Sequence, residues 1–332
     1  MKDLLNRILS HQDLSMDGAR DAMVRIMSGA FDDAQIAGFL VALRAKGETP
    51  DEIAGFAQGM REKMVPVPLS VDAIDMCGTG GDAKGTFNIS TAAAFVVAGG
   101  GVPVAKHGNR SITSQSGSAD VLEALGVDLQ MSPEKVGQAV DQIGIGFMFA
   151  PALHPAMKHV MPARKALAIR TVFNILGPLC NPAGVQRQVI GLFDGALTEP
   201  LAKVLKKLGA KQALLVHGDD GLDELTTTTT TQAAQLHESG QVTSSTIDAQ
   251  SLGLKQATLA ELQGDHPEHN AALLRAILQG QTGPKRDIVV LNAAAGLMVG
   301  GKAQDLEAGI ALANEAINSG KALATLDKLV NF

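Results

Sequence analysis

The sequence predicts an α/β protein in which a small all-helical domain is hinged to a large domain with a mainly parallel central sheet flanked by helices. Three observations predict this fold class. Residues up to Lys63 follow a helical pattern, a proline-containing stretch at 65–70 interrupts it, and short apolar runs then alternate with helical segments, as in βαβ units. The chain has 332 residues, 45% of them hydrophobic, which is enough for two unequal domains.

The predicted helical domain covers residues 1–65 and contains two clear helix starts. Asp32 is expected to cap a helix that carries one apolar stripe and ends at Gly47. The next helix is expected to begin with a capping box formed by Thr49 and Glu52, with proline at its first helical position. These signals predict a unit built from helices alone.

The larger domain is expected to begin after an extended connector. Pro66 and Pro68 cannot continue a helix, so the hinge is placed there. Strands are expected at 73–78, 102–108, 144–150, 185–193 and 212–218. Helices are expected at 90–100, 118–126, 198–209, 270–280, 287–301 and 305–320. A helical segment at about 155–182 is expected to return to the first domain, so the larger domain comprises 70–154 and 183–332.

The charge and the cysteine content argue against several classes of function. A formal net charge of -6 disfavours a protein that coats nucleic acid. Cys77 and Cys180 lie far apart, without the spacing of a zinc site or a disulfide framework, which favours a reducing cytosol. No segment has the composition of a signal peptide or of a membrane span. We therefore expect a cytoplasmic protein with no membrane or nucleic-acid partner.

The stretch DMCGTGGDAKGTFNIS, from Asp75 to Ser90, places four glycines around Asp82 between a predicted strand and a predicted helix. Backbone N–H groups in such a loop bind phosphate oxygens together with the N-terminus of the following helix. A dinucleotide fingerprint fits only loosely, because no acidic residue follows about twenty positions later. A P-loop is excluded, because no Gly-Lys-Ser or Gly-Lys-Thr triplet follows. Ser90 or Thr91 is expected to cap the helix.

A second polar stretch comes at the end of the next predicted strand. Lys106, His107, Asn109 and Arg110 are followed by hydroxyl-bearing residues, which are Ser111, Thr113, Ser114, Ser116 and Ser118. Cations and hydroxyl groups in this position suit a phosphate-bearing ligand, because α/β proteins bind ligands at the carboxyl ends of their strands. The alternatives are a solvated charged face and a capping role for Ser118.

An acidic stretch, HGDDGLDELT, follows the predicted strand at 212–218. Its carboxylates repel one another unless a cation or solvent screens them, and magnesium bound to a substrate phosphate would do so; they are Asp219, Asp220, Asp223 and Glu224. A solvated acidic turn is the alternative. The six threonines at 226–231 form a low-complexity run whose β-branched side chains favour an extended strand or loop.

A basic segment contains Arg164, Lys165 and Arg170. A helix arginine ordinarily lies on the surface, and a carboxylate clamp is the alternative role for Arg164. His154 and His159 do not have the spacing of a helical metal site.

Six motifs occur in order along the chain: GTGGD at 78–82, TFNIST at 86–91, KHGNR at 106–110, SGSADVLEALG at 116–126, RTVFNILGPLCNPAG at 170–184 and DGLDE at 220–224. From Leu4 to about Leu329 the chain resembles the anthranilate phosphoribosyltransferase family. The resemblance implies transfer of a phosphoribosyl group from 5-phosphoribosyl 1-pyrophosphate (PRPP) to the amino group of anthranilate, in tryptophan biosynthesis. It also implies magnesium as cofactor and a homodimer formed through the helical domain. The sequence gives no support for a contact with anthranilate synthase.

The resemblance assigns site residues position by position. Those implied to bind PRPP are Gly78, Gly81, Asp82, Thr86, Asn88, Ile89, Ser90, Thr91, Lys106, His107, Gly108, Asn109, Arg110, Ser111, Ile112, Thr113, Ser114 and Ser118. Those implied to bind anthranilate or line its route are Gly78, His107, Asn109, His154, Arg164 and Pro178. Ser90, Asp223 and Glu224 are implied to hold magnesium, and Lys106, Asn109 and Arg164 are implied to be catalytic. The aromatic amine is already uncharged, so positioning is expected to matter more than proton abstraction.

Two positions depart from the family pattern. Ala168 stands where the family usually has glycine, and the threonine run with Gln235 replaces a more varied segment that usually carries a glutamate. Two other functions stay open, namely a pyrimidine nucleoside phosphorylase with a similar fold and phosphate site, and a non-catalytic nucleic-acid-binding homologue. The intact KHGNR and DGLDE motifs favour the transferase over the phosphorylase, and the acidic composition favours it over the nucleic-acid-binding homologue.

Overall fold

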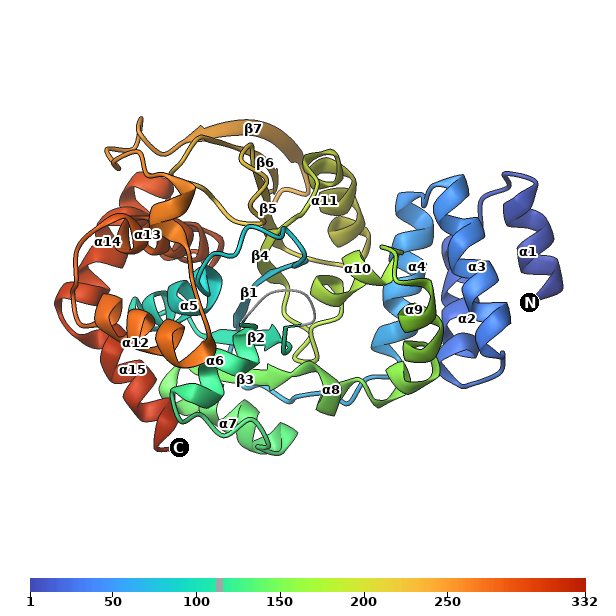
Figure 1. The fold of residues 1–332 in the computed structure, drawn as a ribbon, viewed down its shortest axis with the longest axis horizontal. Coiled ribbons are helices and arrows are strands. Elements are labelled where there is room, and N and C mark those ends of the chain that lie inside the picture. Colours follow the sequence, from blue (N-terminus) through green and yellow to red (C-terminus); the bar gives the residue numbers. More distant parts are fainter. Residues whose placement is uncertain (112–115) are drawn as a thin grey trace.

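The N-terminal helices begin where their capping patterns indicate. They are α1 (Lys2–Leu9), α2 (Met16–Met27), α3 (Asp33–Lys46) and α4 (Pro50–Arg61). The predicted capping boxes at Asp32 and Thr49 are both confirmed. Gly55 and Gly59 let α4 lie directly against α2, because a Cβ at either position would meet the α2 backbone. These helices form the lobe at the right of Figure 1.

The other lobe contains one mixed sheet. Within residues 1–111 and 116–332, which the computed structural model describes, seven strands lie in the order β3-β2-β1-β4-β5-β6-β7. The strands are β1 (Ile74–Gly78), β2 (Val104–Gly108), β3 (Ile145–Phe149), β4 (Arg187–Gly191), β5 (Gln212–Gly218), β6 (Thr230–Leu236) and β7 (Val242–Asp248). The first five pair in parallel and the last two join antiparallel. The predicted mainly parallel sheet is therefore confirmed, and Ile112, Thr113 and Ser114 lie outside the described residues.

Helices flank the sheet as predicted (Figure 1). They are α5 (Ile89–Gly99), α6 (Ser118–Ala124), α7 (Pro133–Ile143), α8 (Ala150–Leu153), α9 (Met161–Leu167), α10 (Phe173–Leu176), α11 (Thr198–Lys207), α12 (Pro267–Leu278), α13 (Pro284–Val299), α14 (Leu306–Asn318) and α15 (Lys321–Val330). α9 contacts α3 and α10 contacts α4, so this returning segment lies against the N-terminal helices. No helix of the described residues is long and apolar enough to cross a membrane.

Alternate residues of the central strands pack into two different hydrophobic cores, because successive side chains of a strand point to opposite faces. Val189 and Leu214 belong to the core that α5 and α13 complete. Ile190 and Leu215 belong to the core that α11, α9 and the N-terminal helices complete. One face of the sheet is therefore continuous with the helical lobe through a shared core.

Some details differ from the sequence prediction. α5 has Asn88 as its N-cap, so Ser90 lies inside its first turn, and the prediction that Ser90 or Thr91 caps it is wrong. Likewise α6 begins at Ser118 after Gly117, so Ser118 is not its cap. The sequence did not indicate α7, α15 or the edge strand β7. The threonine run enters β6 only at Thr230.

Candidate active site

The carboxyl ends of β2, β1, β4 and β5 meet near the centre of one edge of the sheet. The chain crosses from β1 to β2 in one direction, and it returns through β4 and β5 on the other side of β1. Ligands of α/β proteins bind at such a reversal of strand order, outside the carboxyl ends of the strands. The glycine stretch follows β1, the KHGNR stretch includes the end of β2, and the acidic stretch follows β5. These three stretches therefore lie at one edge of the sheet.

Asp223 fits against two glycines that come from different strands. Gly78 and Gly191 are register partners at the ends of β1 and β4. A Cβ at Gly191 would overlap the backbone carbonyl of Asp223, and a Cβ at Gly78 would overlap its carboxylate. The N–H of Gly80 donates to Asp223 Oδ2 at 2.7 Å. The glycine loop and the acidic loop are thus joined directly, and only glycine fits at the two strand ends.

Three carboxylates share the space between these loops. Burial, and then the neighbouring charge of Asp82, raises the pKa of Asp223 to about 7. Burial, and then the charge of Asp223, raises the pKa of Glu224 to about 8. Glu224 Oε1 accepts a hydrogen bond from the Ser90 N–H in the first turn of α5, at 3.1 Å. Three carboxyl groups are therefore crowded in front of the positive end of a helix, and their mutual repulsion opposes full ionisation near pH 7.

The carboxylates fit a magnesium ion that takes part of its coordination shell from elsewhere. Magnesium prefers oxygen ligands and usually keeps water or substrate phosphate oxygens around it. Among the described residues, no group of three His, Cys, Asp or Glu side chains could hold a metal ion alone. A cation between Asp223 and Glu224 would nevertheless remove their mutual repulsion. The donor set therefore suits a divalent cation that is also bound to phosphate.

Two residues that the sequence analysis did not assign to the site fasten the glycine loop. Arg170 donates to the carbonyl oxygen of Gly81, and its guanidinium lies 4.1 Å from the ring centre of Phe193. Gln263 pairs with Thr86 in an isolated β-bridge, and its Nε2 donates to a loop carbonyl oxygen at 2.9 Å. No local sequence motif indicates that Gln263 belongs to the site. Arg170 was noted in the sequence only as part of the basic segment and of the RTVFN motif.

Lys106 lies beneath the strand ends and not in open solvent. Its side chain is buried, and its ammonium group donates to a carbonyl oxygen of β1. Asp75 is fully buried nearby and accepts hydrogen bonds from the His107 N–H at 3.1 Å and from Asn181 Nδ2 at 2.8 Å. Burial raises the pKa of Asp75, and the charge of Lys106 opposes that rise. The positive charge of Lys106 also opposes the rise in the pKa of Glu224, so Lys106 acts on one carboxyl group of β1 and on one of the acidic loop.

The rings of His107 and His154 lie next to each other, close to the backbone of the returning segment. Their ring centres are 5.1 Å apart, and both residues are 8% exposed. Their rings bond the backbone of Gly177 and Cys180, on either side of Pro178. Burial lowers the pKa of His107 to about 3 and that of His154 to about 4, so both rings are neutral near pH 7. Within the described residues, neither Nε2 atom has a hydrogen-bond partner.

Several side chains predicted to bind phosphate are occupied by contacts within the protein. Arg110 pairs with Asp120 at 2.9 Å and Glu123 at 2.6 Å. Asn109 Oδ1 accepts the backbone N–H of Arg110 at 2.7 Å. Asn88 bonds to Asn270 of α12 at 3.1 Å. These residues shape the loops in this structure, and they offer a ligand mainly backbone groups.

The remaining predicted residues lie at the start of α5 and around α6. Ile89 and Thr91 are buried at the start of α5, and the Ile89 N–H donates to the Phe87 carbonyl oxygen at 2.8 Å. Ser118 donates to the carbonyl oxygen of Asn109 at 3.3 Å, and Gly108 lies so close to Ser118 that a Cβ would overlap its hydroxyl. Ser111 donates its backbone N–H to Asp120 at 3.0 Å.

Arg164 differs from Arg110 because it has no acidic partner among the described residues. It lies half-buried on α9, with its guanidinium 5.4 Å from the ring centre of Phe173. Burial lowers its pKa, and no neighbouring charge contributes to that shift. A cation that is partly desolvated and unpaired is ready to bind a carboxylate.

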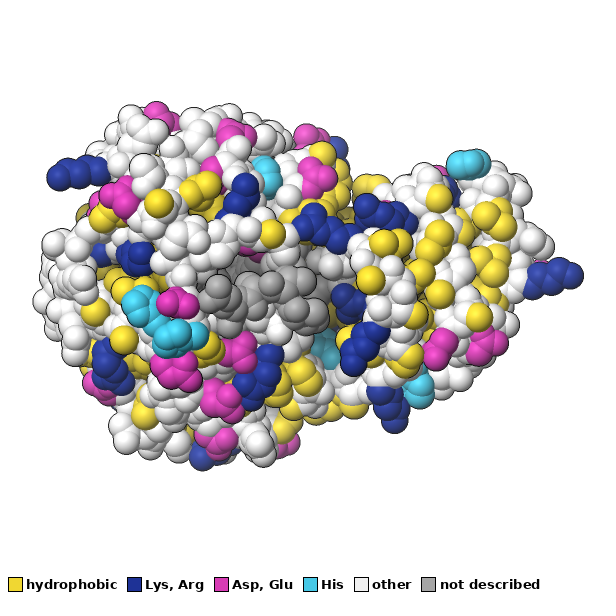
Figure 2. Space-filling model, in the orientation of Figure 1, with side chains coloured by type: hydrophobic (Ala, Val, Ile, Leu, Met, Phe, Trp, Pro, Cys, Tyr) yellow, Lys and Arg dark blue, Asp and Glu magenta, His cyan; other side chains and the backbone are white. Residues whose placement is uncertain are grey.

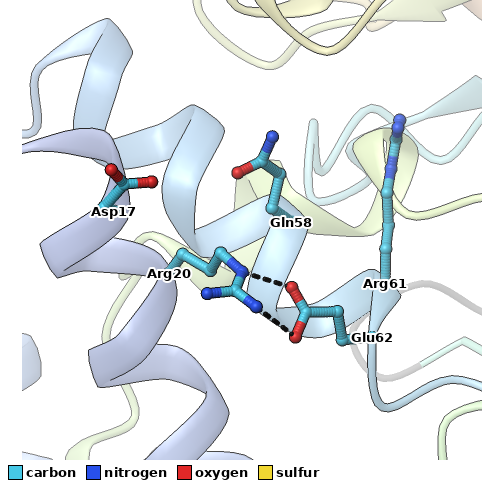
Figure 3. A pocket seen from close by; sticks show the side chains of 5 residues that line it. All are labelled: Asp17, Arg20, Gln58, Arg61 and Glu62. Atoms are coloured by element: carbon cyan, nitrogen blue, oxygen red, sulfur yellow. Dashed lines mark hydrogen bonds and ion pairs between the residues drawn. The ribbon is translucent and has the colours of Figure 1, made fainter.

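The molecule is hollowed between the two lobes, and Lys and Arg side chains gather on the helical side of the hollow (Figure 2). A separate surface hollow of about 460 Å³ lies on the helical lobe between α2 and α4. In it, Arg20 forms an ion pair with Glu62, while Arg61 extends away from them (Figure 3). Arg61 Nε donates to the carbonyl oxygen of Leu179 at 2.8 Å, which ties α4 to the returning segment. This second hollow is away from the strand ends, and we assign it no chemistry.

Two family descriptions match the chain. Residues 2–64 match "Glycosyl transferase family, helical bundle domain", and residues 70–323 match "Glycosyl transferase family, a/b domain". An anthranilate phosphoribosyltransferase from Rhodopseudomonas palustris is 51% identical over 329 residues, covering 99% of this chain and 97% of the relative. The crystal structure of the enzyme of that name from Thermus thermophilus is 44% identical, with a TM-score of 0.93 over 99% of this chain and 98% of its own. The Saccharomyces cerevisiae enzyme, in complex with PRPP and Mg, is 29% identical, with a TM-score of 0.91 and 99% and 96% coverage.

Proposed function

The chain belongs to the anthranilate phosphoribosyltransferase family, and from that premise we propose that it transfers the 5-phosphoribosyl group of PRPP to the amino group of anthranilate. The products are N-(5-phosphoribosyl)anthranilate and pyrophosphate, and the step belongs to tryptophan biosynthesis. The observation that carries this proposal is the pair Asp223 and Glu224, held against the glycine loop and the start of α5 at the reversal of strand order. A nucleoside phosphorylase or a nucleic-acid-binding protein has no comparable support.

The pyrophosphate of PRPP would lie against the glycine loop and the first turn of α5. Backbone N–H groups and the positive end of the helix attract phosphate oxygens there. The proposed contacts are the site residues from Gly78 to Thr91 and from Lys106 to Ser118 named above. Lys106 would supply fixed positive charge, because its side chain is buried and its ammonium group donates to the Met76 carbonyl oxygen. Preorganised charge of this kind stabilises a leaving group most effectively.

Asp223, Glu224 and Ser90 would hold magnesium, which would neutralise charge that builds up on the departing pyrophosphate. Asp223 and Glu224 are positioned for this by Gly80 and Ser90. Asp82 lies close enough to Asp223 for its charge to raise the pKa of that carboxyl group.

Anthranilate would approach from the side of the returning segment. Arg164 would bind its carboxylate, and Asn109 would orient it toward the ribose. His107, His154 and Pro178 would line the route. The two histidine rings are uncharged near pH 7, so they favour a flat aromatic amine and do not compete with Arg164 for its carboxylate.

In the transfer step, the bond from ribose C1 to the pyrophosphate oxygen breaks and a bond from C1 to the amine nitrogen forms. The electron pair of the broken bond leaves with pyrophosphate. The amine nitrogen then loses one proton to solvent. Aromatic amines are uncharged at neutral pH, so the site needs no strong base and acts mainly by alignment and charge stabilisation.

We also propose a cytoplasmic homodimer formed through the helical domain. Two exposed apolar side chains support this interface. Leu9 on α1 is 66% exposed, Val41 on α3 is 43% exposed, and the two helices contact each other. Figure 2 shows hydrophobic side chains gathered over this lobe. We expect Val41→Asp to elute as a monomer in size-exclusion chromatography with light scattering. A wild-type monomer at micromolar concentration would contradict the interface.

The proposed domains are 1–65 with a returning segment at about 155–182, and 70–154 with 183–332. They are proposed to move relative to one another about the connectors.

The experiment that tests the proposed function follows the loss of anthranilate fluorescence when protein, magnesium and PRPP are mixed, with each component omitted in turn. We expect a loss only when all are present. Folded protein that causes no loss would contradict the proposed acceptor, and nucleosides with phosphate would be tested next.

A further inference from the structure

The threonine run at 226–231 is uniform in sequence but not in structure. Thr226 is fully buried, and its hydroxyl donates to Asp220 Oδ2 at 2.7 Å. Thr228 is half-buried, and its hydroxyl donates to the same oxygen. Thr228 also donates its backbone N–H to the Thr226 hydroxyl at 3.0 Å. Two side chains of the run therefore converge on one carboxylate.

Asp220 connects these threonines to the turn that precedes the acidic pair. Its other oxygen, Oδ1, accepts the backbone N–H of Leu222 at 3.0 Å. Leu222 itself is fully buried, and its carbonyl oxygen accepts from the Gly218 N–H at 2.9 Å. The carboxylate of Asp220 thus fixes the backbone between β5 and Asp223.

A second anchor holds the other side of the acidic pair. Asn292, buried on α13, accepts the Leu225 N–H at 3.1 Å and donates to the Leu225 carbonyl oxygen at 2.9 Å. Asp223 and Glu224 lie between Leu222 and Leu225, both of which are fully buried. The two carboxylates therefore have little freedom to move away from Gly80 and Ser90.

Two members of the run, Thr227 and Thr229, lack this role, whereas the Thr231 hydroxyl accepts the Thr226 N–H at 3.0 Å. Thr227 is 2% exposed, and within the described residues its hydroxyl has no hydrogen-bond partner. Thr229 is exposed, and the described part of the chain gives its side chain no hydrogen bond. The run therefore contains its own control positions.

We propose that Thr226 and Thr228 are positioning residues, which act through Asp220 to hold Asp223 and Glu224 in the geometry that binds PRPP with its magnesium ion. This inference rests on the proposed function for its ligand, but the loop order that it describes is a property of the free protein. Neither threonine touches the substrate. Each hydroxyl stabilises the conformation of the turn. Without it, repulsion between Asp223 and Glu224 would favour conformations in which the two carboxylates lie farther apart.

The test compares Thr226→Val and Thr228→Val with the matched controls Thr229→Val and Thr227→Val. Valine keeps the shape and removes only the hydroxyl, and Thr226→Ser restores the hydroxyl. Hydrogen exchange of residues 219–226 is measured in the free protein, and the Kd of PRPP in the presence of Mg²⁺ is measured by calorimetry. We expect both Thr226→Val and Thr228→Val to exchange faster and to raise Kd by about three- to tenfold, the range for one lost hydrogen bond. Thr226→Ser, Thr227→Val and Thr229→Val should bind as wild type does.

Each outcome decides a separate claim. If Thr226→Val cannot be purified folded, the half-buried Thr228→Val decides alone. Unchanged exchange and unchanged Kd in the folded variants overturn the inference, as does an equal rise in Kd for Thr229→Val. Faster exchange with unchanged Kd also overturns it, because the hydroxyls would then stabilise the loop without positioning the ligand groups. Wild-type protein that does not bind PRPP contradicts the proposed function, and the exchange rates then judge the loop order by themselves.

Discussion

Replacing Arg164 with alanine separates binding of anthranilate from stability of the fold. Arg164 is half-buried, and among the described residues no carboxylate balances its charge. A charge-assisted hydrogen bond to a charged group contributes about 1.5–3 kcal/mol, which corresponds to about a 10- to 150-fold change in affinity. We therefore expect Arg164→Ala to raise the KM for anthranilate by this factor.

The same substitution should not destabilise the free protein. Burying part of the Arg164 charge without a partner lowers the stability of the folded protein. Its contact with the Phe173 ring at 5.4 Å raises that stability by roughly 0.5–1 kcal/mol. These two contributions oppose each other. We expect the Tm of Arg164→Ala to stay within about 1–2 °C of wild type, since roughly 1 kcal/mol shifts the Tm of a chain of this size by that amount.

The assay is steady-state kinetics with either substrate varied, followed by thermal unfolding of the same preparations. Lys165→Ala is the matched control, because Lys165 is the adjacent cation on α9 and is exposed. The KM for PRPP should change less than the KM for anthranilate. An unchanged KM for anthranilate in Arg164→Ala, or an equal rise in Lys165→Ala, would refute the assignment of Arg164 to the carboxylate.

Three further predictions concern the fold around the site. Ala168 ends α9 with φ 50° and ψ 28°, a left-handed conformation that glycine adopts more easily, so Ala168→Gly should raise the free energy of unfolding in urea by roughly 0.5–1 kcal/mol; no gain would contradict strain there. Gly191→Ala would force a Cβ into the Asp223 backbone and should cost roughly 3 kcal/mol in the same assay, whereas Gly38→Ala, which has open space, should be neutral or stabilising. The pKa of His107 is about 3 in the folded protein and about 6.5 when unfolded, so only the unfolded chain gains this proton below pH 6.5. Between pH 7 and pH 5 the stability of wild type relative to His107→Gln should therefore fall by about 2 kcal/mol, and a difference independent of pH would contradict the neutral buried ring.

Local patterns predicted most of the fold because they are physical causes of it. The capping boxes at Asp32 and Thr49 satisfy backbone donors within one turn of sequence, so their effect can be identified from four residues. The strands around the sheet centre are buried on both faces and therefore appear as apolar runs. β7 was missed because it is an edge strand whose VTSSTID sequence is largely exposed and polar. Asn88 caps α5 without a side-chain hydrogen bond, so no capping pattern marks that boundary.

The site was predicted as stretches but not as geometry. The sequence indicated which strand ends carry polar residues, because that follows from element order and the rule for α/β sheets. It could not show that Arg110 is held by Asp120 and Glu123, since that pairing depends on how α6 lies against the loop. It also gave no role to Gln263, whose contact with the Lys84 carbonyl oxygen joins residues 179 positions apart.

Gly78 and Gly191 illustrate why such details need the folded chain. In the sequence, Gly78 belongs to a glycine-rich stretch that suggests close approach of a ligand, and Gly191 belongs to an ordinary apolar strand. In the structure the same residue explains why glycine is needed at both positions, because Asp223 occupies the space that a Cβ would need at either one. The acidic loop reaches this place because Asp220 and Asn292 fix it on both sides. Part of the glycine content therefore serves the placement of a carboxylate, and a substitution at Gly191 should disturb the proposed magnesium position as strongly as a substitution in the acidic loop itself.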